Sequence, residues 1–454
     1  MLEFYRANAW DDARKRKYDS ANYAWAWEQP ELRNQLLSLR RAAQVDGLAK
    51  LQLIERAQIF TNLGNQLNSA GRLVEAGEYW TRAINEHPKF AMALANRGYA
   101  WYNYARAHYD SSHQTVFLYR AHQSLSAALA RGADWGSAPD GARDFFVDLR
   151  ARIAKMINVK RLATDLRLDG YGLGRSRRER DYRRWALDHI LFLNPLNDLG
   201  NSDIAATDAL SLPSYRTPLD DGPTLIAFFN QMKQEFASAR WLLFEGIADD
   251  APHFSDRDTK LHDTLDDPGY SLSIEKTKLA FRSAYSLLDK VAFFLNDYLK
   301  LGIPLVAVSF RSLWFEKRGS TTLRPVFTTA QNWPLRGLYW LAKDFVEEDF
   351  QASTEPDASD LATIRNHLEH RYLKVHDRDP LYSSPAPPVY DDRLALSVER
   401  HELEAKALRI LKLARAALIH LCLAMHREEY IRAKDDKGFT VPMTLPTWKP
   451  RPRF

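Results

Sequence analysis

The sequence predicts an all-α protein, and two patterns support this prediction. Long stretches carry apolar residues at i, i+3, i+4 and i+7 spacing, which places these residues along one face of a helix. The clearest stripe consists of Leu279, Ala280, Tyr285, Leu288, Val291, Ala292, Leu295 and Leu299. Strands with alternating polarity are scarce, because the best candidate, residues 305–308, suits the start of a helix after Pro304 equally well.

The composition indicates a folded chain with more than one domain. The chain has 454 residues, of which 45% are hydrophobic and 27% are charged, so it can bury sizeable cores. The net charge of +5 does not by itself indicate a nucleic-acid partner. A single cysteine, Cys422, excludes an intramolecular disulfide and a cysteine-based zinc site. We see no apolar signal segment and no membrane-spanning run, so we expect a cytoplasmic protein with no membrane contact.

Residues 57–130 contain a helical repeat. Its eight spaced positions are Phe60, Leu63, Gly64, Leu67, Ala76, Trp80, Ala83 and Pro88. Small residues at Gly64 and Ala76 allow two antiparallel helices to approach closely, and Pro88 ends the second helix. A second unit has Leu94, Gly98 and Trp101 at the matching positions, an insert at 109–116, and then Ala121, Leu125 and Ala128. This spacing resembles the tetratricopeptide (TPR) repeat, whose concave groove implies a protein partner or regulator.

We divide the chain into four parts. Residues 1–157 form a TPR-like stack, completed by helices near 20–43 and 140–157. Residues 158–224 form a basic hinge and a connecting helix that stops at 194–195. The hinge contains GYGLG (170–174) and a run at 175–184 with six arginines against two acids. Residues 225–434 hold five or six long helices, and residues 435–454 form an extended, proline-rich basic tail.

The segment 364–371 is the most informative stretch for function. Arg365 and His370 have Arg-x4-His spacing, and Asn366 follows the arginine. The same spacing occurs at Arg82–His87, Arg184–His189, Arg257–His262, Arg371–His376 and Arg415–His420, so most matches are chance. Only Arg365 is followed by asparagine, and only its helix follows a loop-like segment in which Ser359 or Asp360 is suited to cap the helix.

This motif and its neighbouring helices resemble the HEPN (higher eukaryote and prokaryote nucleotide-binding) superfamily. The similar stretches are 182–200, 278–301 and 332–345, and the resemblance to an uncharacterised bacterial subfamily covers residues 180–434. It implies a helical bundle and metal-independent RNA cleavage at a site that two HEPN domains share. It further implies a homodimer through the HEPN domain and a role in phage defence or as a toxin. Arg365, Asn366 and His370 are then the catalytic residues.

The residue types suit this chemistry. A histidine titrates near neutral pH and can remove the proton of a ribose 2′-OH, which then attacks the adjacent phosphorus. Arg365 would neutralise the phosphate oxygens, and Asn366 would orient His370 or hold the phosphate. A two-fold dimer supplies the second histidine, so no metal or cofactor is required. The expected products are a 2′,3′-cyclic phosphate and a 5′-OH.

Other interpretations stay open for these residues. The motif is otherwise an exposed helix face with an Arg365–Glu369 ion pair. We expect RNA contacts from Arg371 and from the hinge arginines Arg175, Arg177, Arg178 and Arg180, although the hinge also suits a solvated face with internal ion pairs. A metal site at His367, His370 and His376 lacks a third ligand at a recognised spacing. The rival function is a catalytically silent HEPN/TPR scaffold that binds a protein partner or RNA.

Four polar residues, in two adjacent pairs, are expected to have structural roles. Asp289 and Lys290 lie in a strongly apolar helix, and we favour an internal ion pair between them over a place in the active cleft. Asn197 and Asp198 follow a proline turn, where their side chains are expected to bond local backbone amides.

Overall fold

The computed structural model describes residues 1–17, 23, 25–136, 138–218, 220–248, 251–262, 264–317, 319–353, 358–377, 392–435 and 440–448. The side chains of residues 45, 46, 346, 351–353, 358–360 and 435 are not described. The expected caps Ser359 and Asp360, and the ends of the proline-rich tail, therefore lie outside the described side chains. The described part of that tail, 440–448, contains neither helix nor strand.

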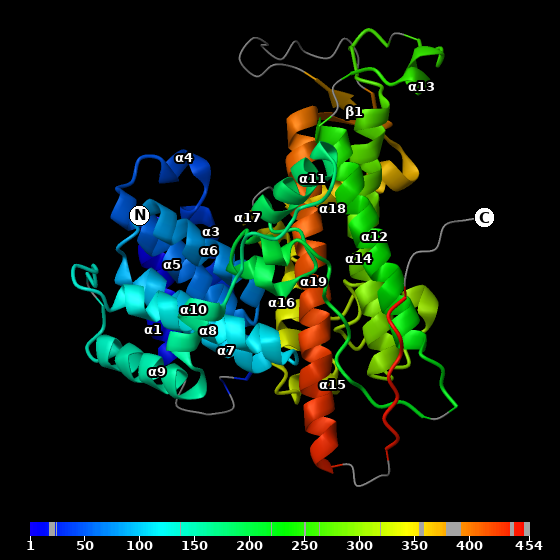
Figure 1. Cartoon of the computed structure of the whole chain (residues 1–454). Coiled ribbons are helices and arrows are strands. Elements are labelled where there is room, and N and C mark those ends of the chain that lie inside the picture. The colour runs from blue at the N-terminus through cyan, green and yellow to red at the C-terminus, as the bar shows by residue number, and fades with distance from the viewer. Residues whose placement is uncertain are drawn as a thin grey trace.

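The predicted all-α class is confirmed. The N-terminal half consists of α1 (Leu2–Lys15), α3 (Pro30–Ala42), α4 (Val45–Leu48), α5 (Leu53–Ala70), α6 (Leu73–Glu86), α7 (Ala91–Ala107), α8 (Ser111–Ala128) and α9 (Ala142–Met156). Consecutive helices α5 and α6 pack together, as do α7 and α8. In Figure 1 these helices, blue to cyan, form a layer to one side of the long helix α19.

Small residues hold these hairpins together, as the spacing predicts. A Cβ atom added to Gly64 would lie 2.8 Å from Nε1 of the buried Trp80, and one added to Gly98 would lie 2.8 Å from Cγ of Leu125. The sequence predicted that an insert at 109–116 lengthens the turn before the second helix. This prediction is wrong, because α8 already begins at Ser111. Asp110 caps it by accepting a hydrogen bond from the His113 amide at 2.9 Å. The helices are present, and their assignment to the TPR family stays a prediction.

The connecting region contains α10 (Val159–Asp165), α11 (Arg177–Asp188) and the 3₁₀ helices η1 (Pro195–Leu199) and η2 (Asp203–Ala205). The expected helix end at 194–195 is wrong, because α11 ends at Asp188. Ile190 there has a left-handed φ of 57°, and the Leu191 amide donates back to the Ala186 carbonyl at 2.8 Å. Asn197 bonds local backbone as expected, accepting from the Phe192 amide at 3.2 Å.

The C-terminal half is a bundle around one long helix. Its elements are α12 (Thr224–Ala248), α13 (Phe254–Arg257), α14 (Leu272–Tyr298), the 3₁₀ helix η3 (Leu305–Ala307), α15 (Pro325–Thr328), α16 (Trp333–Val346), α17 (Glu348–Ser353), α18 (Ala358–His370) and α19 (Arg400–Asp435). The candidate strand at 305–308 is thus mainly a 3₁₀ helix. Helices α12, α14 and α19 pack side by side, and α19 lies between them and the N-terminal layer (Figure 1).

A small parallel sheet, which the sequence does not predict, follows α18. Strand β1 (Tyr372–His376) pairs with β2 (Ala395–Glu399), with Tyr372 opposite Ala395. The last four residues of β1 are all buried, so the strand lacks the alternation of a half-exposed strand.

Buried ion pairs join the two halves of the molecule. Arg40 and Arg72 both bind the carboxylate of Asp344 on α16, at 2.8 and 2.7 Å. Arg72 also pairs with Glu75, which accepts from Arg409 of α19 at 3.1 Å. Burial by itself would raise the pKa of Asp344, but the two arginines lower that pKa well below its usual range. These charges therefore bind α3, α6, α16 and α19 to one another.

Replacing Asp344 by Asn should be strongly destabilising, because it leaves buried arginines without their counter-ion. We expect a loss of about 3–5 kcal/mol in the free energy of unfolding, measured by urea denaturation. The exposed Asp349, which pairs with Arg33 at 2.9 Å, provides the matched control. Asp349→Asn should cost no more than about 1 kcal/mol. Equal, small losses in both variants would contradict the role of Asp344.

A buried histidine should make stability depend on pH. His108 is 1% exposed and stacks on Tyr104, and neither ring nitrogen has a hydrogen-bond partner among the described residues. Burial and the nearby His113 lower the pKa of His108 to about 3. An unfolded histidine has a pKa of about 6.5, so between these values the unfolded chain binds a proton that the folded chain does not.

His108 should therefore cost stability as the pH falls below about 6.5. Replacement of His108 by Phe should remove this loss. The free energy of unfolding of the variant, relative to that of the original chain, should therefore rise by about 2 kcal/mol between pH 7.5 and pH 5. Urea denaturation at both pH values measures the difference. Parallel pH profiles for the two proteins would contradict the prediction.

Candidate functional site

Helix α18 presents the motif on its surface. Its apolar face consists of Leu361, Ile364 and Leu368, all buried. This face packs α18 against α14 and α16, and β1 follows directly. Arg365 is half-buried, whereas Asn366 and His370 are exposed. The motif therefore remains on the open side of the helix, and neither Arg365 nor His370 is sealed in the core of the chain.

The side chain of Arg365 is braced without a carboxylate. Its Nη1 donates to Oδ1 of Asn366 at 3.2 Å, and its guanidinium carbon lies 5.8 Å from the ring centre of Tyr285 on α14. The alternative Arg365–Glu369 pair is not formed, because Glu369 lies 3.9 Å from Arg282. Within the described part of the chain, Arg365 has no acidic partner. Such a cation remains available to an anionic ligand.

Tyr285 supports this arginine as a neutral ring. Burial, together with Asp289, raises its pKa, and Arg365 and Arg311 oppose that rise. The phenol therefore stays protonated at neutral pH, and its ring face attracts the guanidinium. Tyr285 belongs to the predicted apolar stripe, but nothing in the sequence pattern links it to Arg365.

His370 ends α18 and has an exposed ring. In contrast, Nδ1 of His367 lies 2.9 Å from the carbonyl of Thr363, one turn earlier. The C-terminal end of a helix attracts positive charge. Arg371, the next residue, is exposed as well. This end of α18 thus places a histidine and an arginine in contact with solvent.

Strand β1 fixes the end of the helix. Lys374 of β1 is buried and pairs with Asp266 at 2.6 Å and with Asp392 at 2.9 Å. Because β1 begins two residues after His370, these pairs restrict how far the end of α18 can move.

Two other Arg-x4-His matches, those that end at His376 and His420, contain residues buried within the fold. His376 is buried in β1. Arg415 is buried in α19 and pairs with Asp198 at 2.6 Å, and His420 lies 3.0 Å from the Gly71 carbonyl. The expectation that Asp198 bonds local amides is wrong, because its carboxylate serves Arg415 and the hydroxyl of Tyr104.

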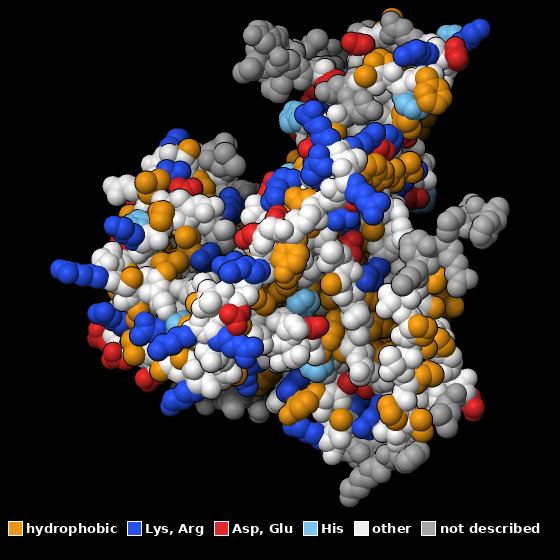
Figure 2. Space-filling view, in the orientation of Figure 1, with side chains coloured by type: hydrophobic (Ala, Val, Ile, Leu, Met, Phe, Trp, Pro, Cys, Tyr) orange, Lys and Arg blue, Asp and Glu red, His pale blue; other side chains and the backbone are white. Residues whose placement is uncertain are grey.

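The hinge arginines lie mostly on α11, and they divide into two groups. Four of the run form ion pairs, Arg177 with Asp181, Arg178 with Glu245, Arg183 with Glu179, and Arg184 with Asp203. Arg175 and Arg180 are exposed, and their side chains form no ion pair among the described residues, although Arg180 donates to the Arg175 carbonyl at 2.9 Å. Figure 2 shows basic side chains gathered over the position of α11. The solvated-face interpretation therefore accounts for only part of this charge.

The expected pairing of Asp289 with Lys290 is wrong. Lys290 pairs with Glu235 of α12, while Asp289 accepts a hydrogen bond from the Phe310 amide at 2.9 Å. Adjacent residues on a helix point about 100° apart, so the two side chains face different neighbours.

Neither a metal-binding cluster nor a membrane-spanning helix occurs among the described residues. The residues that the structure describes contain no group of three His, Cys, Asp or Glu side chains able to hold a metal ion. Among the same residues, no helix is both long and apolar enough to cross a membrane.

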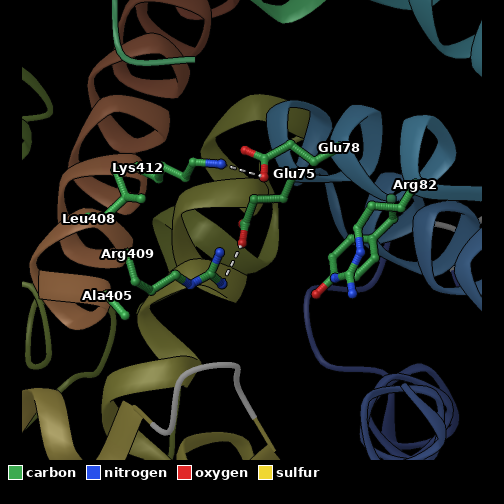
Figure 3. Close-up of a pocket in the computed structure, with 8 residues that line it drawn as sticks. Glu75, Glu78, Arg82, Ala405, Leu408, Arg409 and Lys412 are labelled. Atoms are coloured by element: carbon green, nitrogen blue, oxygen red, sulfur yellow. Dashed lines mark hydrogen bonds and ion pairs between the residues drawn. The ribbon is translucent and has the colours of Figure 1, made fainter. Parts of the chain in front are cut away.

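A pocket between α6 and α19 is crossed by ion pairs that hold the two helices together. Ion pairs cross it from Glu75 to Arg409 and from Glu78 to Lys412, each at 3.1 Å (Figure 3). Its carboxylates are therefore engaged by cations of the opposite helix, and we assign no chemistry to it.

The comparison with family models finds one match. Residues 216–428 match the model described as LA2681-like HEPN. The matched segment contains α12, α14, α16 and α18, and thus the motif at 365–370, together with most of α19. Neither the curated proteins nor the solved structures gave a match. The C-terminal bundle is therefore similar to the HEPN family, whereas the TPR resemblance stays a prediction from spacing alone.

Exposure of the motif can be tested by chemical modification. Diethyl pyrocarbonate acylates accessible imidazoles, so His370 should react faster than the buried His376 and His420. Mass spectrometry of the folded protein measures the three rates, and His420 is a matched control because it ends another Arg-x4-His pair. Equal protection of His370 and His420 would contradict an open site.

Proposed function

We propose that this protein is a metal-independent endoribonuclease that acts through Arg365, Asn366 and His370. One observation carries the proposal: Arg365 is held by Asn366 and Tyr285 but has no acidic partner among the described residues, and an exposed His370 lies on the same helix. The similarity of residues 216–428 to LA2681-like HEPN supports it.

In this mechanism His370 removes the proton from a ribose 2′-OH. The resulting oxygen attacks the adjacent phosphorus, and the bond to the 5′-oxygen breaks. Arg365 neutralises the charge on the non-bridging oxygens, with Asn366 fixing the orientation of the guanidinium. Arg371 contacts a neighbouring phosphate. The products are a 2′,3′-cyclic phosphate and a 5′-OH, so DNA, which lacks the nucleophile, is not cleaved.

The complete site requires two chains. One His370 supplies either the base or the acid, so a two-fold homodimer through the HEPN-like bundle provides the second histidine, which protonates the leaving oxygen. The helical N-terminal half serves as a scaffold for a protein partner or regulator. Control of this kind suits an RNase that acts in the cytoplasm in phage defence or as a toxin.

Replacement of either Arg365 or His370 by Ala should lower RNA cleavage at least about 100-fold, because each variant removes a charge or proton-transfer group from the transition state. Cleavage of single-stranded RNA by the purified protein measures the loss. The neighbouring His367→Ala should keep most activity. Activity should persist in EDTA, and the cyclic phosphate should be detectable by mass spectrometry.

Three results would contradict this function. Full cleavage by both variants would exclude the motif, and full activity in a protein that sedimentation shows to be monomeric would exclude a shared site. A folded dimer that binds RNA or a protein partner without cleaving RNA would favour the silent scaffold.

A further inference from the structure

A second pocket lies between α11 and α12, on the surface that carries the hinge arginines. It is lined by Ser176, Arg178, Glu179, Tyr182, Arg183 and Trp241. Its volume of about 310 Å³ is at the lower end of the range for ligand pockets. It combines aromatic rings with arginine side chains. Its lining residues belong neither to the motif on α18 nor to the ion-paired pocket between α6 and α19.

The aromatic rings of this pocket are supported by buried polar side chains beneath them. Tyr182 and Trp241 meet edge to face, with ring centres 4.9 Å apart. Nε of the buried Arg240 lies 2.7 Å from the Tyr182 hydroxyl, and Asp208 in turn binds Arg240 at 2.7 Å. The Trp241 ring is therefore fixed in place while remaining half-buried rather than sealed.

The open side of the pocket is cationic. The guanidinium of Arg178 lies 5.5 Å from the Trp241 ring centre, and its side chain, which pairs with Glu245, is 62% exposed. Arg175 and Arg180 lie close by in the sequence, and their exposed side chains form no ion pair among the described residues. The site thus offers a ring face and surplus positive charge together.

We infer that this pocket is an accessory binding site for single-stranded RNA. A base stacks on Trp241 beneath Arg178, and the flanking phosphates contact Arg175 and Arg180. A single strand suits the pocket because its bases have free faces, whereas those of a duplex are stacked on one another. The inference rests on the proposed function and deepens it by naming a feature of the substrate.

The accessory site lies apart from the motif. Helix α11 packs on α12, α12 on α14, and α14 on α18. Packed helix axes lie about 8–10 Å apart, so up to about 30 Å separates α11 from α18. A single strand that reaches both places therefore has to span no more than about 30 Å.

Binding can be measured separately from cleavage. Variants of Trp241 are made in the His370→Ala chain, so that a fluorescent single-stranded RNA of about 30 nucleotides stays intact. Trp241→Ala should weaken binding about tenfold in fluorescence anisotropy, because stacking on the indole is lost. Trp241→Phe should retain most affinity. Trp135→Ala, which changes a half-buried tryptophan of the N-terminal half, is the matched control.

The outcomes separate the two proposals. If His370→Ala still cleaves RNA, the nuclease function fails whatever happens at Trp241. If His370→Ala abolishes cleavage but Trp241→Ala binds RNA as tightly as its parent, only the accessory site is wrong. Equal displacement of RNA from parent and Trp241→Ala by polyglutamate would also overturn it, since the surface would then bind any polyanion.

A second measurement guards against misfolding of the alanine variant. Ultraviolet cross-linking of the parent His370→Ala chain to the same RNA should attach nucleotides to the peptides that contain Tyr182 or Trp241, identified by mass spectrometry. Cross-links confined to other peptides would reject the accessory site even if Trp241→Ala were unstable.

Discussion

Helix α19 must be covered on every side, and the rest of the structure depends on this constraint. Residues 413–425 are all buried, so this part of the helix has no polar face to present to water. Helices α12 and α14 cover one side, while α16 and the N-terminal layer cover the others. The two halves of the chain are therefore one packed body, in which the N-terminal half supplies part of the core of the HEPN-like bundle.

Two charges buried at this junction, Arg415 and Asp344, are paired with side chains from distant segments. Arg415 of α19 is held by Asp198, and Asp344 of α16 is shared by Arg40 and Arg72. A buried charge without a partner is costly, so these pairs disfavour arrangements of the layers that would separate them. In contrast, Arg365 at the edge of the bundle lacks such a partner among the described residues, and this difference distinguishes a candidate ligand-binding arginine from a structural one.

The sequence predicted the helices and the motif because both depend on local periodicity. The apolar stripe from Leu279 to Leu299 predicted the helix that the structure has as α14 (Leu272–Tyr298), and the presence of Arg365, Asn366 and His370 on one helix follows from their separation alone. It did not predict β1, whose buried residues do not alternate, or the end of α11 at Asp188, which a left-handed residue decides.

The sequence by itself determined that the chain is helical and that its motif residues share a helix, because these properties require only neighbours along the chain. Tertiary structure alone decided that Tyr285 supports Arg365, that Glu369 faces Arg282, and that Trp241 meets Tyr182. Each of these contacts joins segments between 59 and 87 residues apart. Their partners depend on how the helices pack, which no local pattern specifies.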